Sequence, residues 1–318
     1  MTGRPLLVVI TGPTAVGKTG VGIDVAVAVG GEVVSADSMM VYRGMDIGTA
    51  KPTVEEMQGV PHHLIDVVDP DEEFSVARYQ KLATAAIADI HRRKRVPLLV
   101  GGTGLYIRAL TDQYRFPARS DPQLRRRLQD DARRFGSARL HRHLAAVDPT
   151  TAGRLHPNDQ RRITRALEVY YQTGKPFSWF LEQGRRESRY RLVMFGLTMD
   201  RARLYRRIGE RVDELIRAGL VAEVQNLLAR GYSPELTAMK GLGYKEIANY
   251  LREQTTLAEA INILKRNTRR FAKRQLTWFR RDERIRWLDM DECGGRKGAA
   301  QEIVAFLAGV VPPPANHK

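Results

Sequence analysis

The chain has 318 residues, 43% of them hydrophobic, which is enough for one large or two moderate globular domains. No apolar run approaches the ~18 residues of a membrane-spanning helix, and a single cysteine excludes an intramolecular disulfide framework or a cysteine-rich zinc site. Lysine and arginine number 52 against 36 acids, a net charge of +16, which points to a polyanionic partner. We expect a cytoplasmic protein with no membrane partner, and a monomer by default.

The first patterned stretch is GPTAVGKT, between an apolar run over residues 6–10 and a predicted helix over residues 18–29. Strand, glycine-rich loop and helix together are the setting of a phosphate-binding loop, because backbone N–H groups and the helix N-terminus favour an anion. Lys18 adds a full charge, and the Thr19 hydroxyl is placed to hold a divalent cation. We expect the whole loop to take part: Gly12, Pro13, Thr14, Ala15, Val16, Gly17, Lys18 and Thr19.

Strands and helices then alternate. Residues 32–36 form a predicted strand that ends in Asp37, and residues 39–52 a long loop that is functional or mobile. The following elements are a possible short strand (64–68), an amphipathic helix (75–94), an apolar strand (96–100) and a helix (104–112). This order predicts an α/β protein with a parallel sheet of the phosphate-loop (P-loop) type, flanked by helices. Its carboxyl edge would collect the phosphate loop, Asp37 and Thr103.

The pattern changes after residue 112. Residues 116–191 are mostly helical and carry 17 basic against 8 acidic residues, and a strand over 191–197 then returns to the sheet. We therefore predict a core of residues 1–115 and 191–318 with an inserted helical domain, 116–190, that binds RNA. Helices over 200–230, 256–281 and 299–308 and a strand over 285–288 complete the core, and the tail 311–318 is expected to be disordered.

The helix predicted over 256–281 is strongly basic. Between residues 260 and 281 it has eight lysines or arginines and no acid. Like charges four residues apart cost a few tenths of a kcal/mol per pair, which a phosphate backbone would offset. A merely solvated face is the alternative, but such faces are usually mixed in sign.

Two groups at the predicted sheet edge stand out. The strand over residues 96–100 ends in glycines, whereas the strand over residues 32–36 ends in Asp37, which could order a metal shell or act as a base. Thr103 could cap the next helix, contact a substrate, or do both.

The motifs SADSMMVYRGMDIGTAKP, HHLIDV, GGTGLY, HPNDQRRITRALEVY and RQLTWFR follow the phosphate loop in this order. Together they resemble the bacterial tRNA dimethylallyltransferases, also called tRNA isopentenyltransferases, over about residues 6–289. The sequence departs from that family's usual pattern at Val16 and Met40.

The resemblance implies transfer of a dimethylallyl group from dimethylallyl pyrophosphate to N6 of the adenosine at tRNA position 37, next to the anticodon. The phosphate loop and Arg211 would hold the pyrophosphate, with Mg²⁺ bound through Thr19, while Asp37 would take the proton and Thr103 position the base. The implied contacts to the tRNA anticodon stem-loop are Asp37, Ser38, Met39, Met40, Thr103, Arg125, Gln160, Arg161, Arg162, Ile163 and Thr164, together with the loop 240–245. From the residues alone, Arg211 could equally form a helix-surface ion pair, and the arginines at 161, 162 and 165 a solvated helix face.

Three other functions compete with this one. A phosphate-loop kinase of a small metabolite would leave the basic insertion unexplained. An isopentenyltransferase acting on free adenine nucleotides would use the same donor. A non-catalytic RNA-binding protein would leave the phosphate loop and Asp37 without a role.

Overall fold

The computed structural model describes residues 3–112, 114, 121–183 and 187–310. The chain forms two compact units, one of residues 1–110 and 189–318 and one of residues 111–188, where the sequence predicted a division at 116–190. Each unit has its own hydrophobic core. The expected disorder of residues 311–318 concerns positions outside the described residues.

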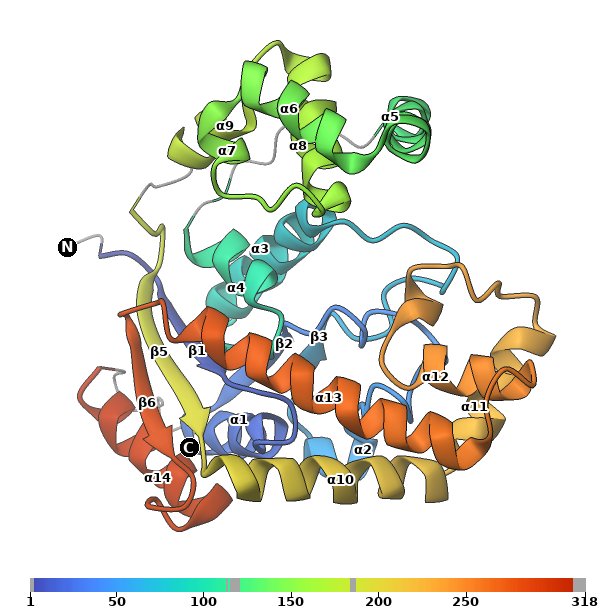
Figure 1. Cartoon of the computed structure of the whole chain (residues 1–318). Coiled ribbons are helices and arrows are strands. Elements are labelled where there is room, and N and C mark those ends of the chain that lie inside the picture. Colours follow the sequence, from blue (N-terminus) through green and yellow to red (C-terminus); the bar gives the residue numbers. More distant parts are fainter. Residues whose placement is uncertain (1–2, 113, 115–120, 184–186, 311–318) are drawn as a thin grey trace. The chain divides into compact units, whose positions relative to one another are not determined.

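The larger unit is built on a six-stranded parallel sheet with the strand order β3-β2-β4-β1-β5-β6 (Figure 1). Its strands are β1 (Leu6–Thr11), β2 (Gly31–Ser35), β3 (His62–His63), β4 (Val96–Val100), β5 (Arg191–Thr198) and β6 (Ile285–Asp289). The phosphate-loop strand β1 is central, with β4 and β5 on either side. The predicted parallel α/β architecture is confirmed.

Successive residues of the central strands bury against opposite faces of the sheet, as a period of two requires. Val8 and Ile10 face a core shared with helices α1 (Lys18–Val29), α10 (Arg201–Arg217) and α14 (Gly295–Ala308). Leu7 and Val9 face a second core, shared with α3 (Val76–Arg92) and α4 (Gly104–Thr111). Near-continuous apolar runs, such as LLVVI in β1, are the signature of strands covered on both faces.

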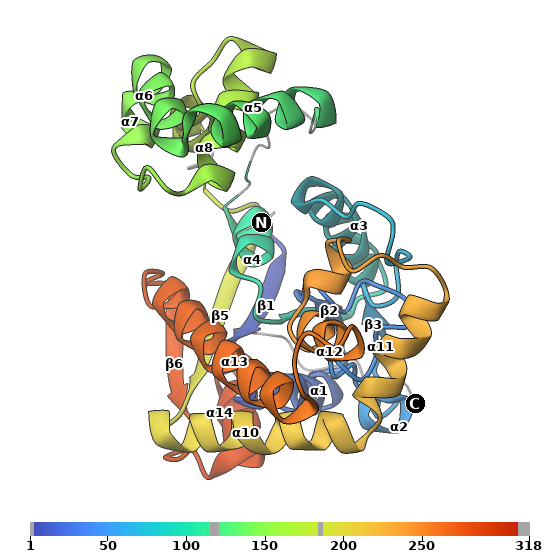
Figure 2. The same cartoon turned by 45° about the vertical axis from the view of Figure 1, so that its right-hand side comes forward.

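The helices of the larger unit are α1 (Lys18–Val29), α2 (Val54–Met57), α3 (Val76–Arg92), α4 (Gly104–Thr111, whose last residue falls in the second unit), α10 (Arg201–Arg217), α11 (Leu220–Ala229), α12 (Tyr244–Leu251), α13 (Leu257–Phe279) and α14 (Gly295–Ala308), with a 3₁₀-helix at Ala238–Lys240. Side-chain caps explain several of their boundaries. Ser75 caps α3, and Thr256 forms a capping box with Glu259 at the start of α13. Helix α13 packs along α10, as Figures 1 and 2 show.

The structure corrects three predicted elements. The helix expected over 200–230 is two helices, because Gly219 between them has a φ of 105°, in the left-handed region. The strand expected over 64–68 is replaced by β3 at residues 62–63, since Leu64 and Asp66 also have positive φ angles and cannot continue an extended strand. Helix α14 begins four residues earlier than predicted, at Gly295.

The smaller unit is helical, as predicted. It contains α5 (Pro122–Phe135), α6 (Ser137–Val147), α7 (Pro149–Ala152), α8 (Gln160–Thr173) and α9 (Phe177–Gln183). Its core includes Leu128, Leu144, Ile163 and Leu167. Among the described residues of either unit, no helix combines the length and apolarity that crossing a membrane requires.

Candidate functional site

The phosphate loop joins β1 to α1 and has the shape of an anion cradle. Gly12 has a φ of 143°, and a Cβ there would lie 2.5 Å from the Leu197 carbonyl oxygen, so only glycine fits. Gly17 has a φ of 107° and forms the N-cap of α1. These conformations direct main-chain N–H groups and the N-terminus of a 12-residue helix toward the loop's concave side.

Lys18 lies over this loop and donates a hydrogen bond from Nζ to the Pro13 carbonyl oxygen at 2.7 Å. The pKa of Lys18 is lowered to about 7, chiefly by burial of its ammonium group and also by the nearby Arg211 guanidinium, while the Asp37 carboxylate acts in the opposite direction. Thr19, one residue on, is exposed on the first turn of α1. The lysine is therefore held where an anion would restore its charge.

Arg211 reaches the same place from α10. Burial lowers the pKa of Arg211, and the Asp37 carboxylate raises it. Lys18, Arg211 and Asp37 thus come from three separate elements and lie within electrostatic range of one another. Two cations and one carboxylate leave an excess positive charge in a partly dehydrated place, which a bound anion would balance.

Asp37 and Thr103 meet beside the cradle, as predicted for the carboxyl ends of β2 and β4. The Thr103 hydroxyl oxygen accepts a hydrogen bond from the Ser38 backbone N–H at 3.0 Å, and the Asp37 Oδ1 accepts one from the Met39 N–H at 2.8 Å. Asp37 Oδ2 has no hydrogen-bond partner among the described residues. One carboxylate oxygen is therefore fixed, and the other is available to accept a proton.

A pair of aromatic side chains lies within electrostatic range of Asp37. Tyr79 and Tyr106 are buried and stacked, with ring centroids 3.8 Å apart, and the Tyr79 hydroxyl donates to the Ser35 carbonyl oxygen at 2.9 Å. Burial raises the pKa of both phenols, and the Asp37 charge adds to this. Both tyrosines therefore stay neutral at physiological pH.

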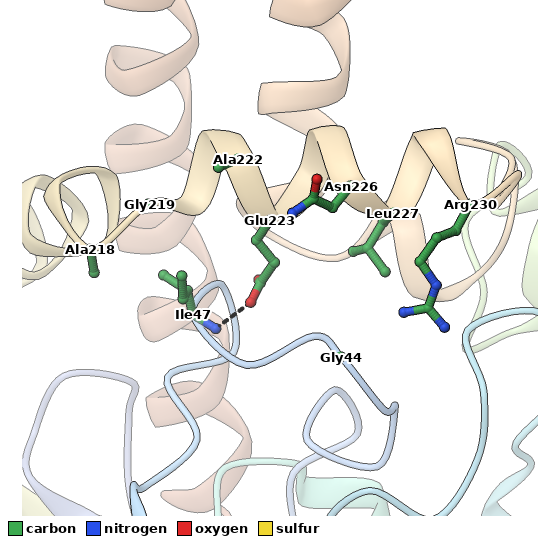
Figure 3. A pocket seen from close by; sticks show the side chains of 9 residues that line it. All are labelled: Gly44, Ile47, Ala218, Gly219, Ala222, Glu223, Asn226, Leu227 and Arg230. Carbon is green, nitrogen blue, oxygen red and sulfur yellow. Dashed lines mark hydrogen bonds between the residues drawn. The ribbon is translucent and has the colours of Figure 1, made fainter.

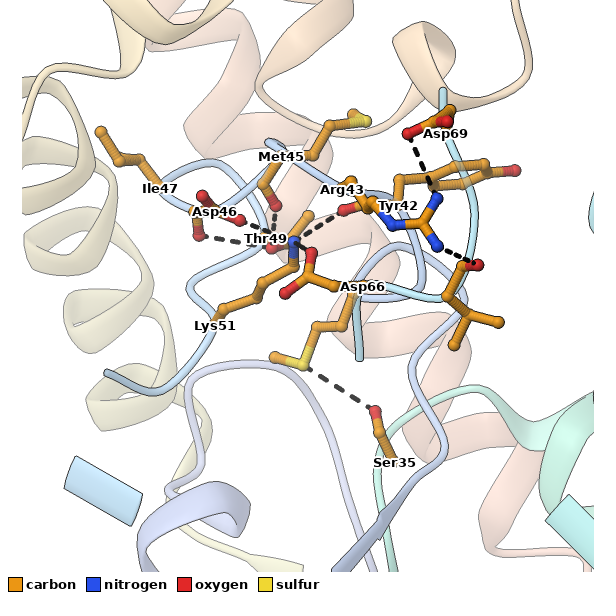
Figure 4. A network of polar contacts seen from close by, with 12 residues as sticks. Ser35, Tyr42, Arg43, Met45, Asp46, Ile47, Thr49, Lys51, Asp66 and Asp69 are labelled. Atoms are coloured by element: carbon orange, nitrogen blue, oxygen red, sulfur yellow. Dashed lines mark hydrogen bonds and ion pairs between the residues drawn. The ribbon is translucent and has the colours of Figure 1, made fainter. Parts of the chain in front are cut away.

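The loop after Asp37, expected to be functional or mobile, is held at many points (Figure 4). The Lys51 side chain is only 6% exposed and donates from Nζ to the Tyr42 carbonyl oxygen and to one carboxylate oxygen each of Asp46 and Asp66, at 2.5–2.6 Å. The Thr49 hydroxyl donates to the Met45 carbonyl oxygen at 2.6 Å. The loop is thereby built around one buried ammonium group.

Glu223 on α11 fastens this loop from outside. Its carboxylate accepts hydrogen bonds from the backbone N–H groups of Asp46, Ile47 and Gly48 at 2.7–3.0 Å and from the Tyr244 hydroxyl at 2.7 Å. Glu223 also lines a cavity of about 400 Å³ between the loop and α11. Figure 3 shows its side chain pointing from α11 to the backbone at Ile47. Neither Lys18 nor Asp37 lines this cavity, so it is separate from the anion cradle.

The segment over residues 240–245, expected to touch RNA, supports the same loop. A Cβ at Gly241 would lie 2.4 Å from the Met39 side chain, and Tyr244 is fully buried with its hydroxyl on Glu223. Met39 and Met40 themselves are half-buried. The segment positions the residues after Asp37, and its contact with RNA stays a prediction.

In the helical unit, Glu168 of α8 is a fully buried carboxylate. It accepts hydrogen bonds from the Asp121 N–H at 2.7 Å and from the guanidinium groups of Arg125 and Arg165 at 2.9 Å. These contacts hold the pKa of Glu168 below its usual value despite burial, which acts the other way. The two arginines remain about one-third exposed and are fixed in orientation.

The predicted RNA contacts at the start of α8 divide into two kinds. Arg161 and Arg162 are exposed, and Gln160 is half-buried. Ile163 and Thr164 are 0% and 3% exposed, and Ile163 is part of the core of the helical unit. The expected contact of these two residues with RNA stays a prediction, and their side chains are not on the surface that Arg161 and Arg162 present. A helix of period 3.6 brings both kinds into one short motif.

The basic residues of α13 are mostly exposed. The exposed ones are Arg266, Arg270, Lys273 and Arg274, as well as Arg280 at the C-cap. Lys265 pairs with Asp213 on α10 at 2.6 Å. The same helix buries Gln275 between the two loops of the site, a residue that the sequence analysis did not single out. Position 275 falls four residues after Phe271 and three before Trp278, so a glutamine on the apolar face of this helix was the available signal.

A phosphate loop at the carboxyl edge of a parallel sheet, with a carboxylate beside it, defines an α/β enzyme of the P-loop class. Comparisons with known proteins are more specific. The family model for IPP transferase matches residues 40–282. The chain is 73% identical over 307 residues to the tRNA dimethylallyltransferase of Desulforudis audaxviator, covering 96% of this chain and 99% of that protein.

Solved structures agree. The full-length tRNA isopentenylpyrophosphate transferase from Bacillus halodurans is 47% identical, with a TM-score of 0.71 and 97% of each chain covered. A eukaryotic dimethylallyltransferase acting on tRNA is 30% identical, with a TM-score of 0.81 over 99% of this chain and 81% of that one. This chain belongs to the IPP transferase family.

Proposed function

We propose that this protein transfers a dimethylallyl group from dimethylallyl pyrophosphate to N6 of the adenosine at tRNA position 37, releasing pyrophosphate. Family membership and relatives named tRNA dimethylallyltransferase support this function. The observation that carries it is the convergence of Lys18, Arg211 and Asp37 at one rim, because the reaction needs an anion cradle and a proton acceptor side by side.

The phosphate loop, residues 12–19, and Arg211 bind the donor's pyrophosphate. When the allylic C1–O bond breaks, the bonding pair leaves with the pyrophosphate, and the Lys18 and Arg211 charges and loop N–H groups stabilise it. The exposed Thr19 hydroxyl has no protein partner among the described residues and suits a Mg²⁺ ion, which takes a few protein oxygens and completes its shell with phosphate and water. When bound there, Mg²⁺ neutralises charge on the leaving pyrophosphate.

Asp37 acts as the general base. The N6 lone pair of adenine is delocalised into the ring, so attack on C1 is assisted by removing an N6 proton, which Asp37 Oδ2 accepts. The hydrogen bond from Met39 N–H fixes Oδ1, and the Thr103–Ser38 contact holds the two strand ends together. The acceptor base contacts Thr103, Ser38, Met39 and Met40.

The adenosine reaches this place flipped out of the anticodon loop. The tRNA backbone contacts the exposed cations of α13 and, in the helical unit, Arg125, Gln160, Arg161 and Arg162. The anticodon stem-loop is the part of tRNA that carries position 37. The protein acts as a monomer in the cytoplasm, where tRNA is found; its free Cys293 suits that reducing compartment.

The test is transfer of label from labelled dimethylallyl pyrophosphate, with Mg²⁺, to bulk tRNA or to AMP. We expect label in tRNA, on N6 of adenosine after nuclease digestion. Label in AMP alone would indicate an isopentenyltransferase acting on free nucleotides. ATP consumption with no label in either acceptor would indicate a kinase, and RNA binding with neither reaction would indicate a non-catalytic RNA-binding protein.

A further inference from the structure

Gln275 of α13 connects the two loops that form the site. Its side-chain Oε1 accepts a hydrogen bond from the Thr14 backbone N–H at 2.8 Å, and its Nε2 donates to the Gly102 carbonyl oxygen at 2.9 Å. Gln275 is only 7% exposed. A single buried amide therefore bridges the phosphate loop after β1 and the glycine loop after β4.

We propose that Gln275 is a positioning residue that sets the spacing between the donor's pyrophosphate and the acceptor adenosine; this inference rests on the proposed function. The bridge continues on the acceptor side, because Thr103 follows Gly102 and binds Ser38, the neighbour of Asp37. A continuous chain of contacts thus joins Thr14 in the donor cradle to the proposed base. Gln275 itself contacts no reacting group.

This position matters because prenyl transfer requires C1 and N6 to approach within ~3–3.5 Å in line with the breaking bond. A displacement of about 1 Å between the donor and acceptor loops can cost on the order of 100-fold in rate. The same bridge commits the Thr14 N–H to the protein, as the hydrogen bond from the Val16 N–H to the Pro13 carbonyl oxygen at 3.4 Å commits a second N–H group of the loop.

Glutamine is the side chain that this bridge needs. Both partners are main-chain groups, one a donor and the other an acceptor, so the side chain must offer an acceptor and a donor at a fixed separation. Glutamate keeps the acceptor and loses the donor, and methionine fills similar space with neither. Comparing glutamine, glutamate and methionine at position 275 therefore distinguishes the contribution of the two hydrogen bonds from that of packing alone.

Gly102 offers an independent test of the same contact. A Cβ at Gly102 would lie 2.3 Å from Gln275 Nε2, whereas its next nearest contacts are 3.4 Å to Gln275 Cδ and 3.5 Å to the Gly12 carbonyl oxygen. Gly102 does not have a positive φ angle. The position therefore requires glycine because Gln275 is there, and removing that side chain should make alanine acceptable.

The first experiment compares Gln275→Met and Gln275→Glu with the wild type, and uses Gln301→Met on the exposed face of α14 as the matched control. Prenyl transfer, KM for dimethylallyl pyrophosphate, tRNA Kd and melting temperature are measured. We expect kcat to fall at least tenfold in both Gln275 variants, with tRNA Kd within about twofold, and the control to match the wild type.

The second experiment is a double-mutant cycle. Gly102→Ala should lower kcat at least tenfold in the wild type but less than about twofold in a Gln275→Ala background, because the clashing atoms are gone. Additive losses would overturn the inference, as would a Gln275→Met variant with unchanged kcat or one whose tRNA binding falls as much as its kcat. If the wild type itself transfers no label, the proposed function fails, which is a separate result.

Discussion

The partly dehydrated Lys18 makes a measurable prediction about protons. With its pKa lowered to about 7 in the free protein, about nine in ten Lys18 groups are neutral at pH 8 and about one in ten at pH 6. A bound pyrophosphate places negative charge beside the ammonium group and raises its pKa again. Binding at pH 8 should therefore take up about 0.9 proton at Lys18, and binding at pH 6 about 0.1.

The sign of the pH dependence follows. Because the complex holds more protons than the free protein, affinity for pyrophosphate is greatest below pH 7 and falls as the pH rises above it. Titration calorimetry at pH 6 and pH 8, in buffers of different ionisation enthalpy, gives the proton count. Lys18→Met is the control, since the titration of pyrophosphate itself is common to both proteins. Equal proton uptake by the wild type and Lys18→Met at pH 8 would refute this reasoning.

Three further outcomes are expected. Lys18→Met should raise the melting temperature of the free protein by at least about 2 °C below pH 7 and progressively less toward pH 10.5. The reason is that keeping Lys18 protonated destabilises the folded state, whose Lys18 pKa is the lower one, and this destabilisation disappears as the pH rises from 7 to 10.5. Glu223→Gln should lower the free energy of unfolding by about 1–3 kcal/mol, since at least one of the four donors that Glu223 accepts from loses its acceptor. The control Glu210→Gln, on the exposed face of α10, should change it little. Equal urea midpoints for the two variants would contradict the role of Glu223 in holding the loop after Asp37. Binding of tRNA should weaken with salt with a log–log slope of about −3 or steeper in filter binding, and a flat response would remove α13 and the helical unit as the RNA footprint.

The sequence predicted most of the framework because the relevant signals are local. The phosphate loop, its flanking strand and helix, and the strand over 96–100 follow from glycine placement and apolar runs that lie within a few residues of one another. The helix starts predicted at residues 75 and 256 agree with the structure, where Ser75 and Thr256 cap the two helices. The convergence of Asp37 and Thr103 followed from a topological rule about parallel strands.

What the sequence could not show depends on long-range contacts. Glu223 is one acid among several on an amphipathic helix, and only the fold places three N–H groups from residues 46–48 against it. Gln275 meets Thr14 across 261 positions of the chain. The break at Gly219 was missed because a single glycine inside a helical pattern is often tolerated.

The burial of Ile163 and Thr164 has a similar cause. A motif read as a string does not separate the two sides of a helix, and the exposed Arg161 and Arg162 adjoin residues that fill the core. Which residues of such a motif are available to a partner is decided by packing against α5 and α6.

The central claim is that Asp37 removes a proton from the acceptor beside a bound diphosphate. Single-turnover transfer of label to tRNA by Asp37→Asn, which keeps the shape of the side chain and removes its basicity, tests this most directly. We predict a rate lower by about 10²–10⁴-fold with a tRNA Kd within about threefold of the wild type. A rate close to that of the wild type, or a loss of tRNA binding as large as the loss of rate, would contradict the account.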